Sequence, residues 1–164
     1  MGYTTEFKGA FELNHKLSKK HQAYLEKFSA TRRMKRAETL ASALPDPIRL
    51  AVDLSIGQEG EFFVGGKGFM GQDDDPSVIE HNYPPTTQPS LWCHWIPSAN
   101  GDYIVWDEGE KFYFYADWLN YLIENFLEPW GYVLNGSVLW QGEDIEDRGE
   151  LLVTNNVLEV KKLD

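Results

Sequence analysis

The sequence contains a single cysteine and no long apolar run in its 164 residues. Cys93 alone excludes a disulfide within the chain and a metal site built from several cysteines, and it is typical of a reducing compartment. No apolar segment approaches the roughly 18 residues that a membrane span needs, and the N-terminus lacks the basic start and apolar run of a signal peptide. We therefore predict a cytoplasmic protein that does not bind membranes.

The motifs of common enzyme classes are also absent or incomplete. There is no G-x-S-x-G elbow and no HExxH or CxxC spacing, and no acid pair stands out as a general acid and base among the 26 Asp and Glu residues. Gly66, Gly68 and Gly71 spell G-x-G-x-x-G, but three aspartates follow where a dinucleotide site needs a helix N-terminus. Because those carboxylates would repel a phosphate, we predict a covering loop and no cofactor.

The residues that could bind a metal lack a ligand spacing. Asp73, Asp74 and Asp75 offer oxygen ligands for Mg²⁺ or Ca²⁺, but the EF-hand spacing and its distal Glu are missing. Cys93 and His94 are neighbours in the apolar run LWCHWI, so on a strand they point to opposite faces and cannot act as a pair. We predict no metal site, a solvated turn at the aspartates and a buried Cys93.

Aromatic residues make up 14% of the chain, and they mark its most regular segment, residues 111–132. Five apolar side chains recur there at spacings of three and four, which predicts a helix with one buried face. Pro129 cannot continue that helix, and Gly131 lets the chain turn. The predicted core residues of the helix are Phe112, Tyr115, Leu119, Leu122 and Phe126.

Alternating and helical patterns predict the other elements and one α+β domain over residues 1–164. Its core is expected to be a mostly antiparallel sheet with two main helices on one face, the split β-α-β or ferredoxin-like plan. A hairpin at Asn135-Gly136 is the alternative to the long strand that we expect after the aromatic helix. In order, we expect a strand over 3–13, a helix from an N-cap at Ser18 to about Arg36, a loop-rich insertion over 37–89, strands over 91–96 and 103–106, the aromatic helix, a long strand over 132–143 with a glycine bulge, and a C-terminal hairpin around Asn155-Asn156.

Charge is distributed unevenly in this acidic protein, whose net charge is −11. Residues 1–36 hold nine Lys or Arg against three Glu, whereas residues 37–164 hold six against twenty-three acids. One interpretation is that the two halves pack together and partly neutralise each other, with the excess acid serving solubility. The alternatives are an anion site at the basic end, or an acidic surface that meets a basic partner.

Two sets of residues are candidate binding sites. Arg32, Arg33, Lys35 and Arg36 place four cations within five residues and could hold a phosphate or an acidic patch, unless they pair with the protein's own acids. The second set could form an aromatic surface that stacks a base or an apolar ligand, unless the 37–89 insertion covers it. It comprises Trp92, Trp95, Trp106 and Trp140, all on predicted strands.

Several segments resemble a family of small uncharacterised bacterial proteins. They are TRRMKR, GFMGQDDD, QPSLWCHWIP, WDEGEKFYFYADWLNYLI, PWGYVLNGSVLWQGED and the final VTNNV. The resemblance spans most of the chain and implies a shared compact α+β domain, but it implies no established activity or catalytic residue. The order of helix, apolar strand and Gly-Glu-rich turn is also similar to certain short phage-encoded proteins.

Without a nucleophile, base or metal constellation, the sequence favours a non-enzymatic intracellular binding or regulatory protein that recognises a small anionic ligand or a protein partner. The first alternative is an acidic phage-type inhibitor or anti-defence protein whose carboxylates imitate nucleic acid. The second is a small hydrolase or nucleotide-binding enzyme, which would need a pocket joining His81 or the aspartates to Arg32 or Arg33. We expect no direct binding of nucleic acid, and we leave homo-oligomerisation open.

Overall fold

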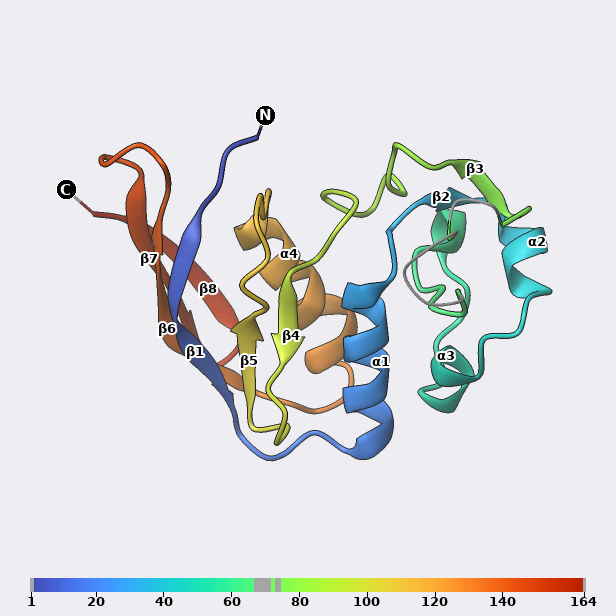
Figure 1. Ribbon diagram of the computed structural model, residues 1–164. Coiled ribbons are helices and arrows are strands. Elements are labelled where there is room, and N and C mark those ends of the chain that lie inside the picture. Colours follow the sequence, from blue (N-terminus) through green and yellow to red (C-terminus); the bar gives the residue numbers. More distant parts are fainter. Residues whose placement is uncertain (1, 67–71, 73–74, 164) are drawn as a thin grey trace. The chain divides into compact units, whose positions relative to one another are not determined.

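A computed structural model describes residues 2–66, 72 and 75–163 of the chain (Figure 1). The chain divides into two compact units: the first comprises Met1–Leu17 and His94–Asp164, and the second comprises Ser18–Cys93. Helices and strands are both present, which confirms the predicted α+β class. The predicted 37–89 insertion falls wholly within the second unit, which also contains the first helix. The expectation of a single domain stays a prediction.

The first unit is built on a sheet of six strands in the order β4-β5-β1-β6-β7-β8. Every neighbouring pair is antiparallel, which confirms the mostly antiparallel sheet. The predicted turn at Asn155-Asn156 joins β7 to β8 through two residues with positive φ. The strands are β1 (Glu6–Leu13), β4 (Trp95–Pro97), β5 (Tyr103–Trp106), β6 (Leu134–Gln141), β7 (Arg148–Thr154) and β8 (Val157–Lys162).

The long strand predicted after the aromatic helix is β6, which pairs along its whole length with β1. The register between Glu6–Leu13 and Leu134–Gln141 is unbroken, so the prediction of a glycine bulge is wrong. Gly136 has a different role, because a Cβ at this position would lie 2.8 Å from the carbonyl oxygen of Ala10 on β1. Glycine at this position therefore permits the backbones of β1 and β6 to approach closely, and it does not mark the extra residue of a bulge.

The aromatic helix covers one face of this sheet as α4 (Tyr115–Leu122) and continues as a π-helical turn, η3 (Ile123–Leu127) (Figure 1). It begins later than the pattern predicts because Phe114 adopts a left-handed conformation with a φ of +59°. After Pro129, Gly131 turns the chain with a φ of +89°, as predicted. The predicted core residues Phe112, Leu119, Leu122 and Phe126 are buried, and Tyr115 is half-buried.

The core of the first unit lies between α4 and one face of the sheet, and aromatic rings dominate it. The Phe7 ring of β1 contacts the rings of Trp95, Trp106, Phe112 and Tyr115 at centroid distances between 5.0 and 5.7 Å. Edge-to-face ring pairs add about 0.5–1.5 kcal/mol each beyond the burial of their area. The high aromatic content of the sequence thus has a packing function in this unit.

The second unit begins with α1, whose N-cap is Ser18 as predicted: its Oγ accepts a hydrogen bond from the His21 N–H at 3.4 Å. The helix ends earlier than expected because Thr31 is extended and the chain continues into a short strand. Within the described residues, no helix is long enough and apolar enough to cross a membrane. The elements are α1 (Lys19–Ala30), β2 (Lys35–Arg36), α2 (Glu38–Ser42), α3 (Pro47–Ala51), a 3₁₀ turn η1 (Gln58–Gly60) and β3 (Val78–Glu80), of which β2 and β3 pair.

Candidate functional site

The four cations predicted as an anion site lie in the second unit, and Arg33 is the most deeply involved in its packing. The Arg33 guanidinium lies over the Phe28 ring at 4.2 Å from the centroid. Its Nη2 donates to the carbonyl oxygens of Glu61 at 2.7 Å and Phe63 at 2.8 Å, and the residue is 2% exposed. A forked donor that binds two main-chain carbonyls fixes the loop that carries them. Arg33 therefore has a structural role in this unit.

Arg36 and Lys35 also have partners within the second unit. The buried Arg36 guanidinium donates to Ser77 Oγ at 2.8 Å and lies 3.5 Å from Asp75 Oδ2. Burial lowers the pKa of Arg36 to about 10. Lys35 forms an ion pair with Glu59 at 3.2 Å. These contacts are the internal pairing that the sequence left as the alternative, and anion binding stays a prediction.

Arg32 is half-buried, and its Nε donates to the carbonyl oxygen of His81 at 2.8 Å. The enzyme alternative needs a pocket that joins these two side chains, but the hydrogen bond from Arg32 goes to the His81 backbone and not to its imidazole. Four residues of the predicted glycine and aspartate motifs lie outside the described residues: Gly68, Gly71, Asp73 and Asp74.

The four predicted tryptophans are divided between the two units. Trp92 belongs to the second unit, whereas the other three belong to the first. Trp95 is 1% exposed and donates through Nε1 to the Tyr115 carbonyl oxygen at 2.8 Å, so α4 covers it. Trp140 is also buried, and the half-buried Trp106 packs against Phe7. The three rings of the first unit therefore contribute to its core.

His94 and Asp107 form an imidazole–carboxylate pair beside the paired residues of β4 and β5. The His94 Nδ1 lies 3.0 Å from both carboxylate oxygens of Asp107, and the Gly109 N–H donates to Asp107 Oδ1 at 2.7 Å. A carboxylate on Nδ1 leaves Nε2 to accept a proton, which is the arrangement of a general base. The hydrogen bonds of this imidazole go to the two carboxylate oxygens of Asp107. Cys93, next in sequence, is buried as predicted.

Asp147 holds the turn between β6 and β7 to the N-terminal segment of the first unit. Its carboxylate accepts hydrogen bonds from Tyr3 Oη at 2.7 Å and from Trp140 Nε1 at 3.0 Å. The Asp144 N–H donates in turn to Tyr3 Oη at 3.1 Å. The hydrogen bond from Tyr3, followed by the one from Trp140, lowers the pKa of Asp147. These hydrogen bonds link the turn to Tyr3 of the N-terminal segment and to Trp140 of β6.

Exposed carboxylates gather at the end of the sheet where this turn lies. The strands β5 and β6 are both antiparallel to β1, which lies between them, so both run toward the end of the sheet at which β1 begins. The loops that follow them carry six exposed acids, which we call the acidic end: Asp107, Glu108, Glu110, Glu143, Asp144 and Glu146.

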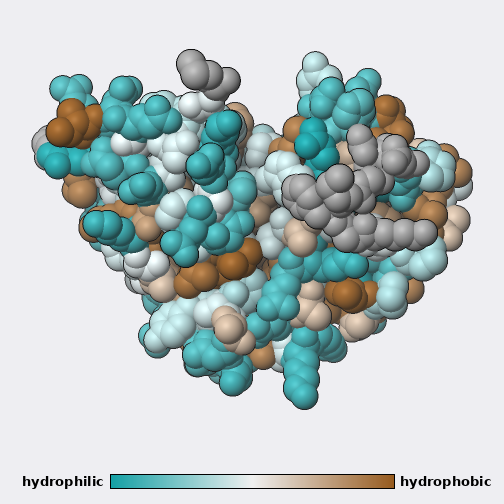
Figure 2. Space-filling view, in the orientation of Figure 1, coloured by the Kyte–Doolittle hydropathy of each residue, from teal (hydrophilic) through white to brown (hydrophobic). Residues whose placement is uncertain are grey.

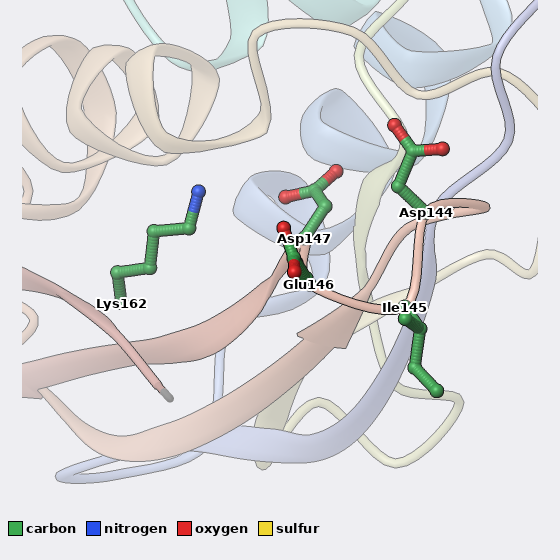
Figure 3. Close-up of a pocket in the computed structure, with 5 residues that line it drawn as sticks. All are labelled: Asp144, Ile145, Glu146, Asp147 and Lys162. Carbon is green, nitrogen blue, oxygen red and sulfur yellow. The ribbon is translucent and has the colours of Figure 1, made fainter.

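An open hollow of about 400 Å³ lies beside the turn of the acidic end and is lined by residues 144–147 and Lys162. Figure 3 shows the Asp144 carboxylate and the Ile145 side chain pointing away from each other, with Lys162 across from Asp147. Ile145 is 81% exposed. Figure 2 shows an apolar patch among hydrophilic residues at the place of this turn. The acidic end thus combines negative charge with an apolar projection.

Almost all of the protein's net negative charge lies in the first unit. That unit holds six Lys and Arg against sixteen Asp and Glu, a net charge of −10. The second unit holds nine against ten, a net charge of −1. The signal for the acidic end was present in the sequence as the density of acids over residues 102–147, where eleven stand against the single cation Lys111. Sequence reasoning missed it because the two acidic loops lie far apart along the chain.

The described residues contain no group of three His, Cys, Asp or Glu side chains that could hold a metal ion. Comparisons with protein-family models, with curated proteins and with solved structures found no match for this chain. Its function therefore has to be argued from the site itself.

Proposed function

We propose that the protein is a non-enzymatic binding protein whose acidic end recognises a basic surface on a protein partner. The observation that carries the proposal is the gathering of six exposed carboxylates on two loops of a unit whose net charge is −10. A surface of one charge sign accelerates the encounter with an oppositely charged partner and discriminates against partners of like charge.

Ile145 adds an exposed apolar side chain to the charged surface of the acidic end. It projects from the turn between two exposed acids, Asp144 and Glu146, and interface cores are typically apolar contacts with a polar rim. Burying such a side chain contributes roughly 1.5–3 kcal/mol. The hydrogen bonds from Tyr3 and Trp140 to Asp147 hold the turn before a partner arrives, which reduces the entropy lost on binding.

An inhibitor that imitates nucleic acid is a narrower form of the same proposal, supported by the same six carboxylates. The partner's basic surface would then be one that normally binds nucleic acid. Excess duplex DNA should displace the protein from such a partner, whereas a partner without a nucleic-acid site should be retained.

Two other hypotheses have less support. Arg33 and Arg36 direct their guanidinium groups to partners within the second unit, so an anion there would compete with existing hydrogen bonds. The pair of His94 and Asp107 is the feature in favour of an enzyme, but the hydrogen bonds of its imidazole go to the two carboxylate oxygens of Asp107.

Three further expectations belong to the proposal. The strand order β6-β1-β5-β4 supports the ferredoxin-like plan, because β1 and β4 flank the first long connection and are separated by β5. The cytoplasmic location rests on the single cysteine. The similarity to small uncharacterised bacterial proteins rests on the segments quoted above.

The experiment uses a variant that removes three carboxylates from the acidic end, Glu143→Gln/Asp144→Asn/Glu146→Gln. Tagged wild-type and variant proteins capture partners from cells that produce the chain, and mass spectrometry quantifies what is retained. We expect the wild type to retain a basic protein that the variant loses by about tenfold or more, which is a free-energy loss of about 1.4 kcal/mol.

The matched control removes three exposed carboxylates from α4, from η3 and from the residue that follows η3, as Asp117→Asn/Glu124→Gln/Glu128→Gln. Its change in net charge equals that of the first variant, so it measures the effect of charge alone. We expect it to retain the same basic protein. An equal loss in both variants, or retention of no basic protein by the wild type, would contradict the proposal.

A further inference from the structure

β8 is the terminal strand of the six-stranded sheet, and it exposes apolar side chains. Val157 is 68% exposed, Val160 53%, and Leu163, which follows the strand, 42%. An exposed apolar edge strand is a surface on which another strand can pair. Lys162 at the end of β8 also lines the hollow beside the acidic end. The inference below concerns the backbone of β8 and a second copy of the chain, so it does not depend on the function proposed above.

The register with β7 determines which backbone groups of β8 face outward. The Leu163 N–H donates to the Arg148 carbonyl oxygen at 3.0 Å, so odd-numbered residues of this segment direct their backbone groups toward β7. The even-numbered residues, Leu158, Val160 and Lys162, direct theirs to the outer edge. In the part of the chain that the structure describes, β8 has no neighbour at that edge.

We propose that β8 pairs antiparallel with β8 of a second copy, centred on Val160, so that the two sheets continue into each other across a two-fold axis. In this register Val160 of one copy faces Val160 of the other, and Leu158 of each copy faces Lys162 of the other. These pairs use the outward backbone groups and form up to about six hydrogen bonds. Side chains of opposite charge meet beside them, because Glu159 faces Lys161 in both directions.

The pattern of side chains favours this register over its neighbours. Moving one strand by two residues sets Glu159 against itself, and moving it by two residues the other way sets Lys161 against itself. A shift by one residue brings together backbone groups that already bind β7. Glu159 and Lys161 lie within one copy at 3.3 Å, so pairing exchanges partners without isolating a charge.

Lysines on an edge strand commonly discourage pairing. Here Glu159 of each copy faces Lys161 of the other, so the lysine does not discourage pairing with a second copy of the chain. A single strand pair buries less than a typical interface, so we expect a dissociation constant in the micromolar to millimolar range, roughly −8 to −4 kcal/mol. Added salt should strengthen the dimer, because it screens the repulsion between two copies that each carry a net charge of −11.

The test is sedimentation of the full chain over protein concentrations from about 10 μM to about 1 mM, the range that such an affinity requires. The wild type should approach the mass of a dimer. Val160→Pro removes the outward N–H at the two-fold axis without removing a hydrogen bond to β7, so it should stay monomeric with an unchanged circular dichroism spectrum. A wild type that is monomeric over this range overturns the proposal.

Charge reversal tests the register. Glu159→Lys and Lys161→Glu should each weaken the dimer about tenfold, because each sets like charges opposite one another. A mixture of the two variants should form a heterodimer, since opposite charges then face each other at both positions. Glu124→Lys on η3 changes the net charge as Glu159→Lys does, and should leave the dimer intact. The proposal fails if this control weakens the dimer equally, or if the mixture does not associate.

Discussion

Arg33 illustrates how a basic motif in a sequence becomes part of a core. Its side chain combines contact with a ring and hydrogen bonds to two carbonyl oxygens, at 2% exposure. Arg33→Met would leave these buried carbonyl groups without their donor. We therefore expect the free energy of unfolding to fall by about 2 kcal/mol or more. Arg32→Met makes the same chemical change at a half-buried side chain and should cost less than about 1 kcal/mol. Urea titrations of both variants measure the difference, and equal losses would show that Arg33 has no special structural role.

Tyr3 controls the titration of Asp147. Its hydroxyl donates the hydrogen bond that most lowers the pKa of this carboxyl group. Tyr3→Phe should therefore raise the pKa of Asp147 toward its ordinary value, as followed by NMR titration of the carboxyl carbon. A lowered pKa stabilises the folded state above the unfolded pKa of about 3.9, and this contribution disappears as the pH falls through the folded pKa. The loss of stability in acid should thus be smaller in Tyr3→Phe, and an unchanged pKa in this variant would be the contrary result.

At the scale of elements, the pairing of β1 with β6 depends on glycine. Gly136 has a φ of +142°, and a Cβ there would press on the backbone of the neighbouring strand. We expect Gly136→Ala to reduce the free energy of unfolding by roughly 2–4 kcal/mol, from strain and steric overlap together. Gly131 also has a positive φ, but a Cβ at that position would have nothing within 4 Å. Gly131→Ala should therefore cost only about 1 kcal/mol, from the backbone conformation alone. Similar losses in thermal unfolding of the two variants would argue against the close approach of β1 and β6.

Sequence periodicity predicted the elements that bury one regular face. The aromatic stripe of α4, the alternation of β1 and the Asn-Asn turn before β8 all follow from local spacing, and the structure confirms them. The boundaries were less predictable because tertiary contacts decide them. Phe114 delays α4 by adopting a left-handed conformation, and Thr31 ends α1 where the chain becomes extended. Neither residue type signals such a backbone conformation on its own.

At the scale of the whole molecule, the candidate site is less visible in the sequence than the fold. The two loops of the acidic end lie at the same end of the sheet because β1 pairs between β5 and β6 and is antiparallel to both. Tyr3 and Asp147, which hold one of these loops, are separated by 144 positions in the chain. The cluster Arg32–Arg36 was conspicuous because its cations are nearly consecutive, yet those cations have partners within the second unit. The cluster that is visible in the sequence therefore serves the packing of the second unit. The acidic end can be recognised only once the strand order of the sheet is known.

The most direct test of the acidic end is a map of where a cationic probe contacts the protein. Titration of the isotope-labelled protein with an oligolysine peptide, followed by amide chemical shifts, should perturb residues 107–110 and 143–147 first, with Ile145 among them. The perturbations should weaken as salt is added, because screening reduces the attraction between exposed charges. Perturbations centred on the acids of α4 and η3, or spread evenly over all exposed carboxylates, would contradict the account.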